Sequence, residues 1–296
     1  AFATPDTWIR ADNGLDRLWL GVDGWKGLRD HPEFVQEAKA KGYLVGFYDS
    51  YHSIHAPDEP DTWETAQFDK ALYEKGAVVL ADGTKKKGFK QKGYVLSPIA
   101  ARPYVEKRVT ERMREISPNS IFIDCDAFGE VFDDYSPDHP ATQEQDTQAR
   151  LDRMAWIRDT FRLVVGSEGG SAYAAPVIHF AHGMMTPVIG WGDPDLTNRT
   201  SPYDLGPYFP PDGPAVFFKS SKPKELYTHL YFNPCSRLPL YEIVFHDSVV
   251  ATHQWLCGSL KFKDLETTRA LLELLYGVPP LYHMNAGEFA VRKTWL

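Results

Sequence analysis

The sequence predicts an α/β fold in the form of a (β/α)8 barrel of the TIM type. Short apolar runs that are typical of buried parallel strands alternate with helical segments over roughly 250 residues. Two of these runs end in a carboxylate, Asp124 and Glu168, that small residues follow. The 296 residues are 43% hydrophobic and 24% charged, which fits a single catalytic barrel domain spanning 1–296. About seven runs qualify as barrel strands, so we expect either that the first strand is missing or that the barrel is cut from a longer parent chain.

The elements follow one another in barrel order. Strand-like runs, of which about seven qualify as good barrel strands, cover residues 18–22, 43–48, 120–124, 163–168, 176–180, 215–218, 240–245 and 278–282. Expected helices cover residues 32–41, with Gly42 as the cap, 103–114, with Pro103 at the start, 143–161 and 265–276. We also expect a polar excursion near 58–93, with a hairpin, and a Pro-rich rim loop near 202–214.

Composition and motifs exclude several functional classes. The formal net charge of -8 argues against a nucleic-acid partner, because no basic stripe offsets it. No segment reaches the length of a membrane span, so we expect a soluble protein with no membrane partner. No dinucleotide fingerprint, phosphate loop or esterase elbow is present, and we expect no cofactor.

Three cysteines are too few for a disulfide framework. Cys125 follows an apolar run, and we interpret it as a small buried hydrophobic residue.

The two strand-end acids carry the functional prediction. The carboxyl ends of parallel strands meet at one rim of a barrel, so Asp124 and Glu168 are expected to face each other across a cleft. Retaining glycoside hydrolysis needs one ionised carboxylate below the anomeric carbon and one protonated carboxyl group beside the leaving oxygen. Asp124 suits the first role and Glu168 the second. Asp126 lies two residues further on and competes with Asp124 for the nucleophilic role, which spacing alone does not decide.

Polar and aromatic residues at other strand ends are candidates for sugar recognition. Hydroxyl groups of a sugar need polar partners, and the apolar face of its ring stacks on aromatic side chains. The candidates are Asp126, Asp49, Tyr51, His52, His246 and Asp247 for hydroxyl groups, and Trp25 and Trp191 for stacking.

A metal site is the main alternative chemistry. His52 and His55 are three residues apart, as are His179 and His182. These stretches are predicted to be strand ends and loops, and no Cys-x-x-Cys pair accompanies them, so we expect no metal. A metal-dependent hydrolase and a non-catalytic carbohydrate-binding barrel are the two alternative functions.

Four segments resemble bacterial barrel glycosidases, namely 122–130 (FIDCDAFGE), 132–137 (FDDYSP), 167–170 (SEGG) and 239–247 (PLYEIVFHD). The sequence is most similar to the α-N-acetylgalactosaminidases and endo-α-N-acetylgalactosaminidases of glycoside hydrolase families 101 and 129. This resemblance implies a retaining mechanism on α-linked N-acetylgalactosamine or a related galacto-configured sugar of glycans. By its motif positions, it implies that Asp124 is the nucleophile and Glu168 the acid/base. It also implies a bacterial protein of the cytoplasm, the periplasm or the secreted fraction.

Overall fold

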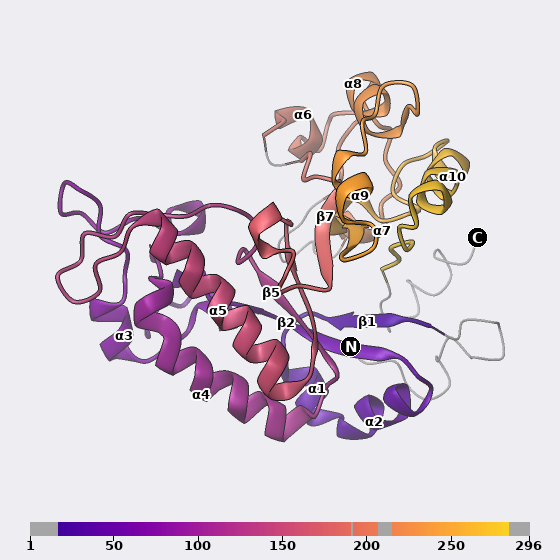
Figure 1. Cartoon of the computed structure of the whole chain (residues 1–296). Helices are drawn as coiled ribbons and strands as arrows, with labels where there is room; N and C mark the ends of the chain where they lie inside the picture. The colour runs from indigo at the N-terminus through magenta and orange to yellow at the C-terminus, as the bar shows by residue number, and fades with distance from the viewer. Residues whose placement is uncertain (1–16, 191, 207–214, 284–296) are drawn as a thin grey trace. The chain divides into compact units, whose positions relative to one another are not determined.

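The computed structural model describes residues 17–190, 192–206 and 215–283. They form two compact units, of which the first ends at His179 and the second begins at Phe180. Each unit combines helices with parallel strands (Figure 1), which confirms the α/β class. The prediction of a single barrel domain stays a prediction.

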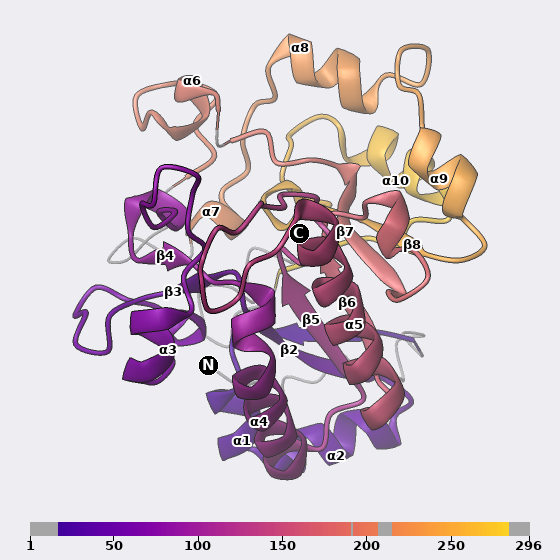
Figure 2. The ribbon, with the colours of Figure 1, turned by 60° about the vertical axis from the view of Figure 1, so that its left-hand side comes forward.

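The first unit is built on four parallel strands in the order β1-β2-β5-β6. They are β1 (Trp19–Val22), β2 (Leu44–Ser50), β5 (Ser120–Asp124) and β6 (Val164–Glu168). Figure 2 shows this sheet with α4 and α5 in front of it. The strands predicted at 18–22, 43–48, 120–124 and 163–168 are thus confirmed to within two residues at each end.

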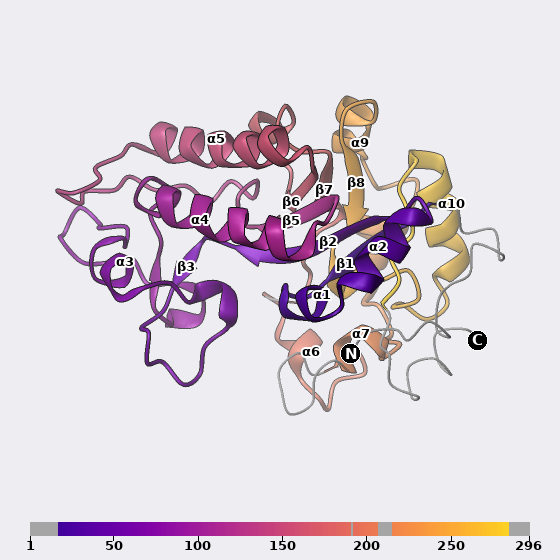
Figure 3. The same ribbon diagram turned by 90° about the horizontal axis from the view of Figure 1, so that it is seen from below.

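One face of this sheet is packed with apolar side chains. Successive strand residues point to opposite faces, and those at Val45, Phe47, Ile121, Ile123 and Val165 are completely buried. Helix α2 (Pro32–Ala40) contacts β2, α5 (Gln143–Phe161) contacts β6, and α4 (Pro98–Ile116) packs against α5. Figure 3 shows α4 and α5 side by side along the sheet. Burial of this face fixes the register, which in turn determines which polar side chains share the other face.

Local capping explains where the two long helices begin. Helix α5 begins with a capping box, in which the Thr142 hydroxyl and the Gln145 side chain satisfy each other's backbone N–H groups. Helix α4 begins at Pro98, five residues before the predicted start at Pro103. Proline lacks an N–H group and is favoured in the first turn, so Pro98 is the starting residue and Pro103 lies within the helix.

The shorter elements of the first unit lie around the sheet. They are α1 (Lys26–Asp30), β3 (Ser53–Ile54), α3 (Lys70–Lys75), β4 (Tyr94–Val95) and the single-turn helices Glu64–Ala66, Phe89–Gln91 and Ala172–Ala174. Strands β3 and β4 form an antiparallel pair. Separately, the Val78 N–H group donates to the Val95 carbonyl, and Ala77 pairs with Leu96 in an antiparallel bridge, which is the pairing expected of the predicted hairpin.

The second unit contains one parallel strand pair, β7 (Phe180–Thr186) with β8 (Val250–His253). Its helices are α6 (Pro194–Thr197), α7 (Ala215–Phe218), α8 (Glu225–Tyr227), the π-helix Thr228–Phe232, α9 (Leu240–Phe245), the turn Trp255–Cys257 and α10 (Glu266–Tyr276). Its core includes Met185, Leu196, Phe232, Phe262 and Leu272.

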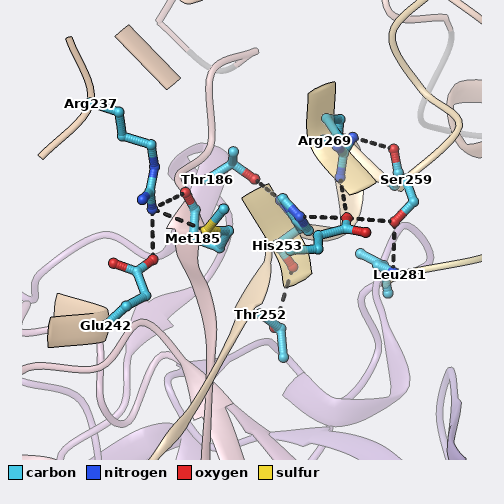
Figure 4. A network of polar contacts seen from close by, with 11 residues as sticks. Met185, Thr186, Arg237, Glu242, Thr252, His253, Ser259, Arg269 and Leu281 are labelled. Atoms are coloured by element: carbon cyan, nitrogen blue, oxygen red, sulfur yellow. Dashed lines mark hydrogen bonds and ion pairs between the residues drawn. The ribbon is translucent and has the colours of Figure 1, made fainter. Parts of the chain in front are cut away.

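A buried polar network lies within this second unit (Figure 4). Thr186 Oγ1 lies 2.8 Å from His253 Nδ1, and His253 Nε2 lies 2.8 Å from a Glu273 carboxylate oxygen. Burial lowers the pKa of His253 to about 4, so the ring is neutral near pH 7. All three side chains are buried, and we interpret this row of contacts from Thr186 through His253 to Glu273 as packing that joins β7, β8 and α10.

Three predicted strands of the second unit are wrong. Residues 215–218 and 240–245 are the helices α7 and α9, and residues 278–282 form no strand. In α9 the apolar side chains of Ile243 and Val244 are exposed, whereas Glu242 is buried in an ion pair with Arg237 at 2.6 Å. As a helix, the segment buries this ion pair rather than its β-branched side chains, so its strand preference does not determine its structure. The backbone at Leu281 instead bonds to Ser259.

The strand predicted at 176–180 begins only at its last residue, where β7 starts. The helix predicted at 265–276 is confirmed as α10, whereas the Pro-rich loop is described only as far as residue 206. No helix in the described part of the chain combines the length and apolarity needed to cross a membrane.

Candidate active site

The candidate site lies in the first unit, where β5 and β6 end. Asp124 is the last residue of β5 and Glu168 the last residue of β6. The two strands pair in parallel, with Phe122 opposite Gly166, so their ends lie side by side. By strand alternation, Phe122 and Asp124 share a face with Gly166 and Glu168. The sheet therefore presents both acids on the face opposite the fully buried apolar one.

The two carboxyl groups lie close to each other. One oxygen of Asp124, one oxygen of Glu168 and the sulfur of Cys125 all lie within 4.8 Å of one another. Two negative charges at so short a distance repel each other, so one of the two carboxyl groups is favoured in its protonated form. The pair is therefore suited to supply one carboxylate and one carboxylic acid at the same place.

The environment assigns the proton to Glu168. Burial, followed by the charge of Asp124 and the hydrogen bond that protonated Glu168 can donate to it, raises the pKa of Glu168 to about 8. Burial also raises the pKa of Asp124, but hydrogen bonds from Tyr48, Glu168 and Cys125 oppose that rise. Near neutral pH, Asp124 is therefore the carboxylate and Glu168 the acid, as glycosidase carboxyl pairs require.

A tyrosine stabilises the charged form of Asp124. The Tyr48 hydroxyl donates a hydrogen bond of 2.7 Å to Asp124 Oδ2. Tyr48 lies on β2 opposite Phe122, and the two rings stack with centroids 5.9 Å apart. This stacking fixes the phenol where its hydroxyl reaches the carboxylate.

The loops that follow the two strands are tied to each other. The Ala127 N–H group donates to Ser167 Oγ at 3.1 Å, and the Ala127 carbonyl accepts from the Ser171 N–H group at 3.0 Å. Gly169 has φ +71°, and a Cβ atom there would lie 2.8 Å from the Phe128 Cα atom. Only glycine allows this backbone conformation together with so close an approach.

Asp126 is buried and does not point into the candidate site. Its two carboxylate oxygens accept from Arg153 on α5 at 2.9 and 2.5 Å, and both side chains are about 1% exposed. The guanidinium group of Arg153 also lies 5.1 Å from the centre of the Tyr51 ring. Of the two competing aspartates, the partly exposed Asp124 is the one beside Glu168, whereas Asp126 anchors its loop to a helix.

The other predicted recognition residues of the first unit are buried. Asp49 alternates with Tyr48 on β2 and so faces away from Asp124, towards Arg108 on α4 at 3.5 Å. Burial raises the pKa of Asp49 to about 6. The ring of Trp25 is 2% exposed, with the guanidinium group of Arg112 at 4.6 Å. The structure does not bring Asp49, Tyr51 or Trp25 to the pair of acids.

His52 contacts the loop that follows Asp124. Its Nε2 atom lies 3.6 Å from a carboxylate oxygen of Glu130, and its ring packs against Phe132. Burial, followed by the charges of Arg150 and other cations, lowers the pKa of His52 to about 3, so the imidazole is neutral. Its described contacts are with this loop and not with the acids.

The predictions for the second unit rested on a wrong strand. His246 and Asp247 follow the helix α9 and precede β8, so they lie at the amino end of that strand. Catalytic groups of parallel barrels gather at the carboxyl ends of strands instead. Both residues are exposed, and the Asp247 carboxylate accepts from the Ser248 hydroxyl. Trp191 lies outside the described residues.

The histidines do not form a metal site in the part of the chain that the structure describes. There, the only group of three potential ligands consists of Asp124, Cys125 and Glu168. His182 bonds through both ring nitrogens, to Thr252 and to the Trp255 N–H group.

Two residues of the site escaped the sequence analysis. Tyr48 lies in the same stretch as the candidates Asp49 and Tyr51, but only the strand register shows which side chain faces the acids. Cys125 was expected to be buried, yet it lies just beyond the strand and is partly exposed, with its thiol donating to Glu168. The only signal in the sequence that places Cys125 at the site is its position directly after Asp124.

Comparison with known proteins assigns the class of this chain. The family model of the glycosyl hydrolases related to the GH101 family, GH129, matches residues 10–296. The chain belongs to this family, which confirms the resemblance stated from the sequence motifs. The comparison with curated protein sequences gives no match.

Solved structures of one enzyme are similar to this chain. The α-N-acetylgalactosaminidase NagBb from Bifidobacterium bifidum, in complex with GalNAc, is 19% identical over 94% of this chain, with a TM-score of 0.60. The ligand-free form is 20% identical over 96% of the chain, with the same TM-score. This likeness concerns the fold alone. The chain spans 40–42% of the length of these relatives.

Proposed function

We propose that this chain carries the catalytic machinery of a retaining glycosidase that cleaves α-linked N-acetylgalactosamine, or a related galacto-configured sugar, from glycans. The observation that carries the proposal is the adjacent pair of Asp124 and Glu168, with oxygens within 4.8 Å. Retaining enzymes hold their carboxyl groups about 5–5.5 Å apart, and inverting enzymes about 6.5–9.5 Å apart. The short separation favours retention.

The proposed reaction has two steps. The Asp124 carboxylate attacks the anomeric carbon while Glu168 gives its proton to the leaving oxygen, so a glycosyl–Asp124 ester forms and the glycosidic bond breaks. Glu168, now ionised, then takes a proton from water, whose oxygen attacks the same carbon and releases Asp124. The raised pKa of Glu168 supports the first role, and the Tyr48 hydrogen bond keeps Asp124 ionised for attack.

Family membership and the name of the similar enzyme support the sugar class. We further propose that the parallel strands of both units belong to a (β/α)8 barrel, with the acids on its carboxyl-terminal rim. Parallel strands followed by helices and acids at strand ends support this architecture.

The test is hydrolysis of an aryl α-N-acetylgalactosaminide by the wild type, D124N and E168Q. We expect D124N to lose at least about a thousandfold in kcat/KM and E168Q about 10²–10⁴-fold on substrates with poor leaving groups. E168Q should lose less on activated aryl glycosides, which depart without a proton. Asp138→Asn and Glu111→Gln are matched controls at exposed positions and should keep wild-type rates.

The stereochemistry of the first product separates the mechanisms. NMR should show the α-anomer before mutarotation, and the β-anomer would refute retention. Full activity in D124N or E168Q would refute the assignment of the pair. Binding of the sugar without any turnover by the wild type would favour the carbohydrate-binding alternative.

A further inference from the structure

Cys125 occupies a strained position between the two acids. Its φ of +64° lies in the left-handed region, which residues other than glycine rarely adopt. The Cys125 carbonyl accepts from the Arg150 guanidinium group at 3.4 Å and from the Phe128 N–H group at 3.4 Å. Arg150 is itself fixed by an ion pair with Asp146 at 2.6 Å. The surroundings therefore hold Cys125 in a conformation that glycine would adopt without strain.

This backbone conformation directs the thiol at the reactive carboxyl groups. Cys125 Sγ lies 3.6 Å from Glu168 Oε2, to which it donates a hydrogen bond, and it lies within 4.8 Å of an Asp124 carboxylate oxygen. Burial, followed by the charges of Asp124 and Glu168, raises the pKa of the thiol well above its ordinary value. The sulfur therefore keeps its proton and remains a donor throughout the working pH range.

We propose that Cys125 is a positioning residue for the reaction, whose thiol proton holds the Glu168 carboxyl group against Asp124 and stabilises the ionised form of both acids. This inference rests on the proposed glycosidase function. It assigns to the thiol no bond formation and no proton transfer. Its consequence is a particular pH profile, because a donor that stabilises two carboxylates keeps both titrations at lower pH.

The test compares three substitutions at one position. Cys125→Ser keeps a donor, Cys125→Ala removes it, and Cys125→Gly removes it while relieving the strained backbone. In the Ala and Gly variants, both limbs of the pH profile of kcat/KM should move up by about half a unit to one unit. The rate should fall about threefold to tenfold on the acidic side and rise on the alkaline side. The Ser variant should keep the wild-type profile, as should Cys235→Ser, which removes an exposed cysteine.

A titration that needs no turnover separates this inference from the proposed function. The carboxyl carbon of Glu168, followed by 13C NMR in the wild type and the three variants, should titrate higher in Ala and Gly but not in Ser. If the wild type is inactive but Glu168 titrates in this way, the glycosidase proposal is refuted and the contact between the thiol and Glu168 is still supported. Unchanged titration in Ala and Gly, or an equal change in Ser, would overturn the role of Cys125.

Discussion

Replacing Glu168 by glutamine should stabilise the protein increasingly as pH rises. In the unfolded chain this carboxyl group has an ordinary pKa of 4.5, whereas in the folded protein burial and Asp124 raise the pKa to about 8. Between these values the folded chain keeps a proton that the unfolded chain has lost. The free energy of unfolding of the wild type therefore falls as pH rises from about 4.5 to 8. Glutamine has no proton to lose and removes this dependence.

The magnitude follows from the pKa difference of about 3.5 between the folded and unfolded chain. At about 1.4 kcal/mol for each pH unit, the largest possible effect is about 5 kcal/mol. Glu168 is partly exposed and solvent screens its charge, so we expect about 2–4 kcal/mol at pH 8 and close to zero at pH 4.5. In a chain of this size that corresponds to a rise in Tm of about 4–8 °C at pH 8.

The assay is thermal or urea unfolding of the wild type and E168Q at several pH values from 4.5 to 9. Glu111→Gln removes an exposed carboxyl group on α4, and its difference from the wild type should not change with pH in this way. A constant difference between E168Q and the wild type over this range would refute the reasoning. So would a difference that shrinks as pH rises, because it would mean that folding lowers the pKa of Glu168.

Two further changes test the surroundings of the acids. Tyr48→Phe removes the 2.7 Å donor to Asp124, so the acidic limb of the pH profile should rise by about 1–2 units, and an unchanged limb would contradict the contact. Gly169 has a φ of +71°, and a Cβ atom there would lie 2.8 Å from the Phe128 Cα atom. Gly169→Ala should therefore lower the free energy of unfolding by about 2–4 kcal/mol and slow turnover. Gly83 has a φ of +82° but open space around it, so Gly83→Ala should lower the free energy of unfolding by only about 1–2 kcal/mol, as measured by urea unfolding. An equal loss of stability at the two sites would contradict the close approach of Gly169 to Phe128.

The sequence predicted the first unit better than the second for a physical reason. In the first unit, the strands ending at Asp124 and Glu168 are buried apolar runs with helices between them, and local pattern and tertiary packing agree. In the second unit they conflict, because α9 exposes its apolar residues and buries Glu242. Strand β8 was missed, although Val249 precedes it and Val250 is its first residue, because its run is short and ends in polar residues.

The face of each strand was less predictable than the strand itself. In a parallel strand covered on both sides the sequence lacks a clear alternation, so it does not show whether Tyr48 or Asp49 faces the acids. The register with β5 decides this, since Tyr48 lies opposite Phe122. Register depends on long-range packing, which is why the sequence does not show which residue of this stretch faces the acids.

Asp124 and Asp126 have different structural roles, and the contacts of Asp126 can offset the free energy that the candidate site costs in folding. Asp124 and Glu168 are both held with raised pKa values, and Cys125 adopts a left-handed backbone, so each costs free energy of folding. Asp126, two residues beyond Asp124, forms a fully buried, two-bond ion pair with Arg153 on α5. Breaking such a pair by removing one partner costs about 3–5 kcal/mol, so it can resist displacement of the strained loop. Asp126, a candidate nucleophile in the sequence, thus holds the loop beside Asp124, and we expect it to take no direct part in the proposed reaction.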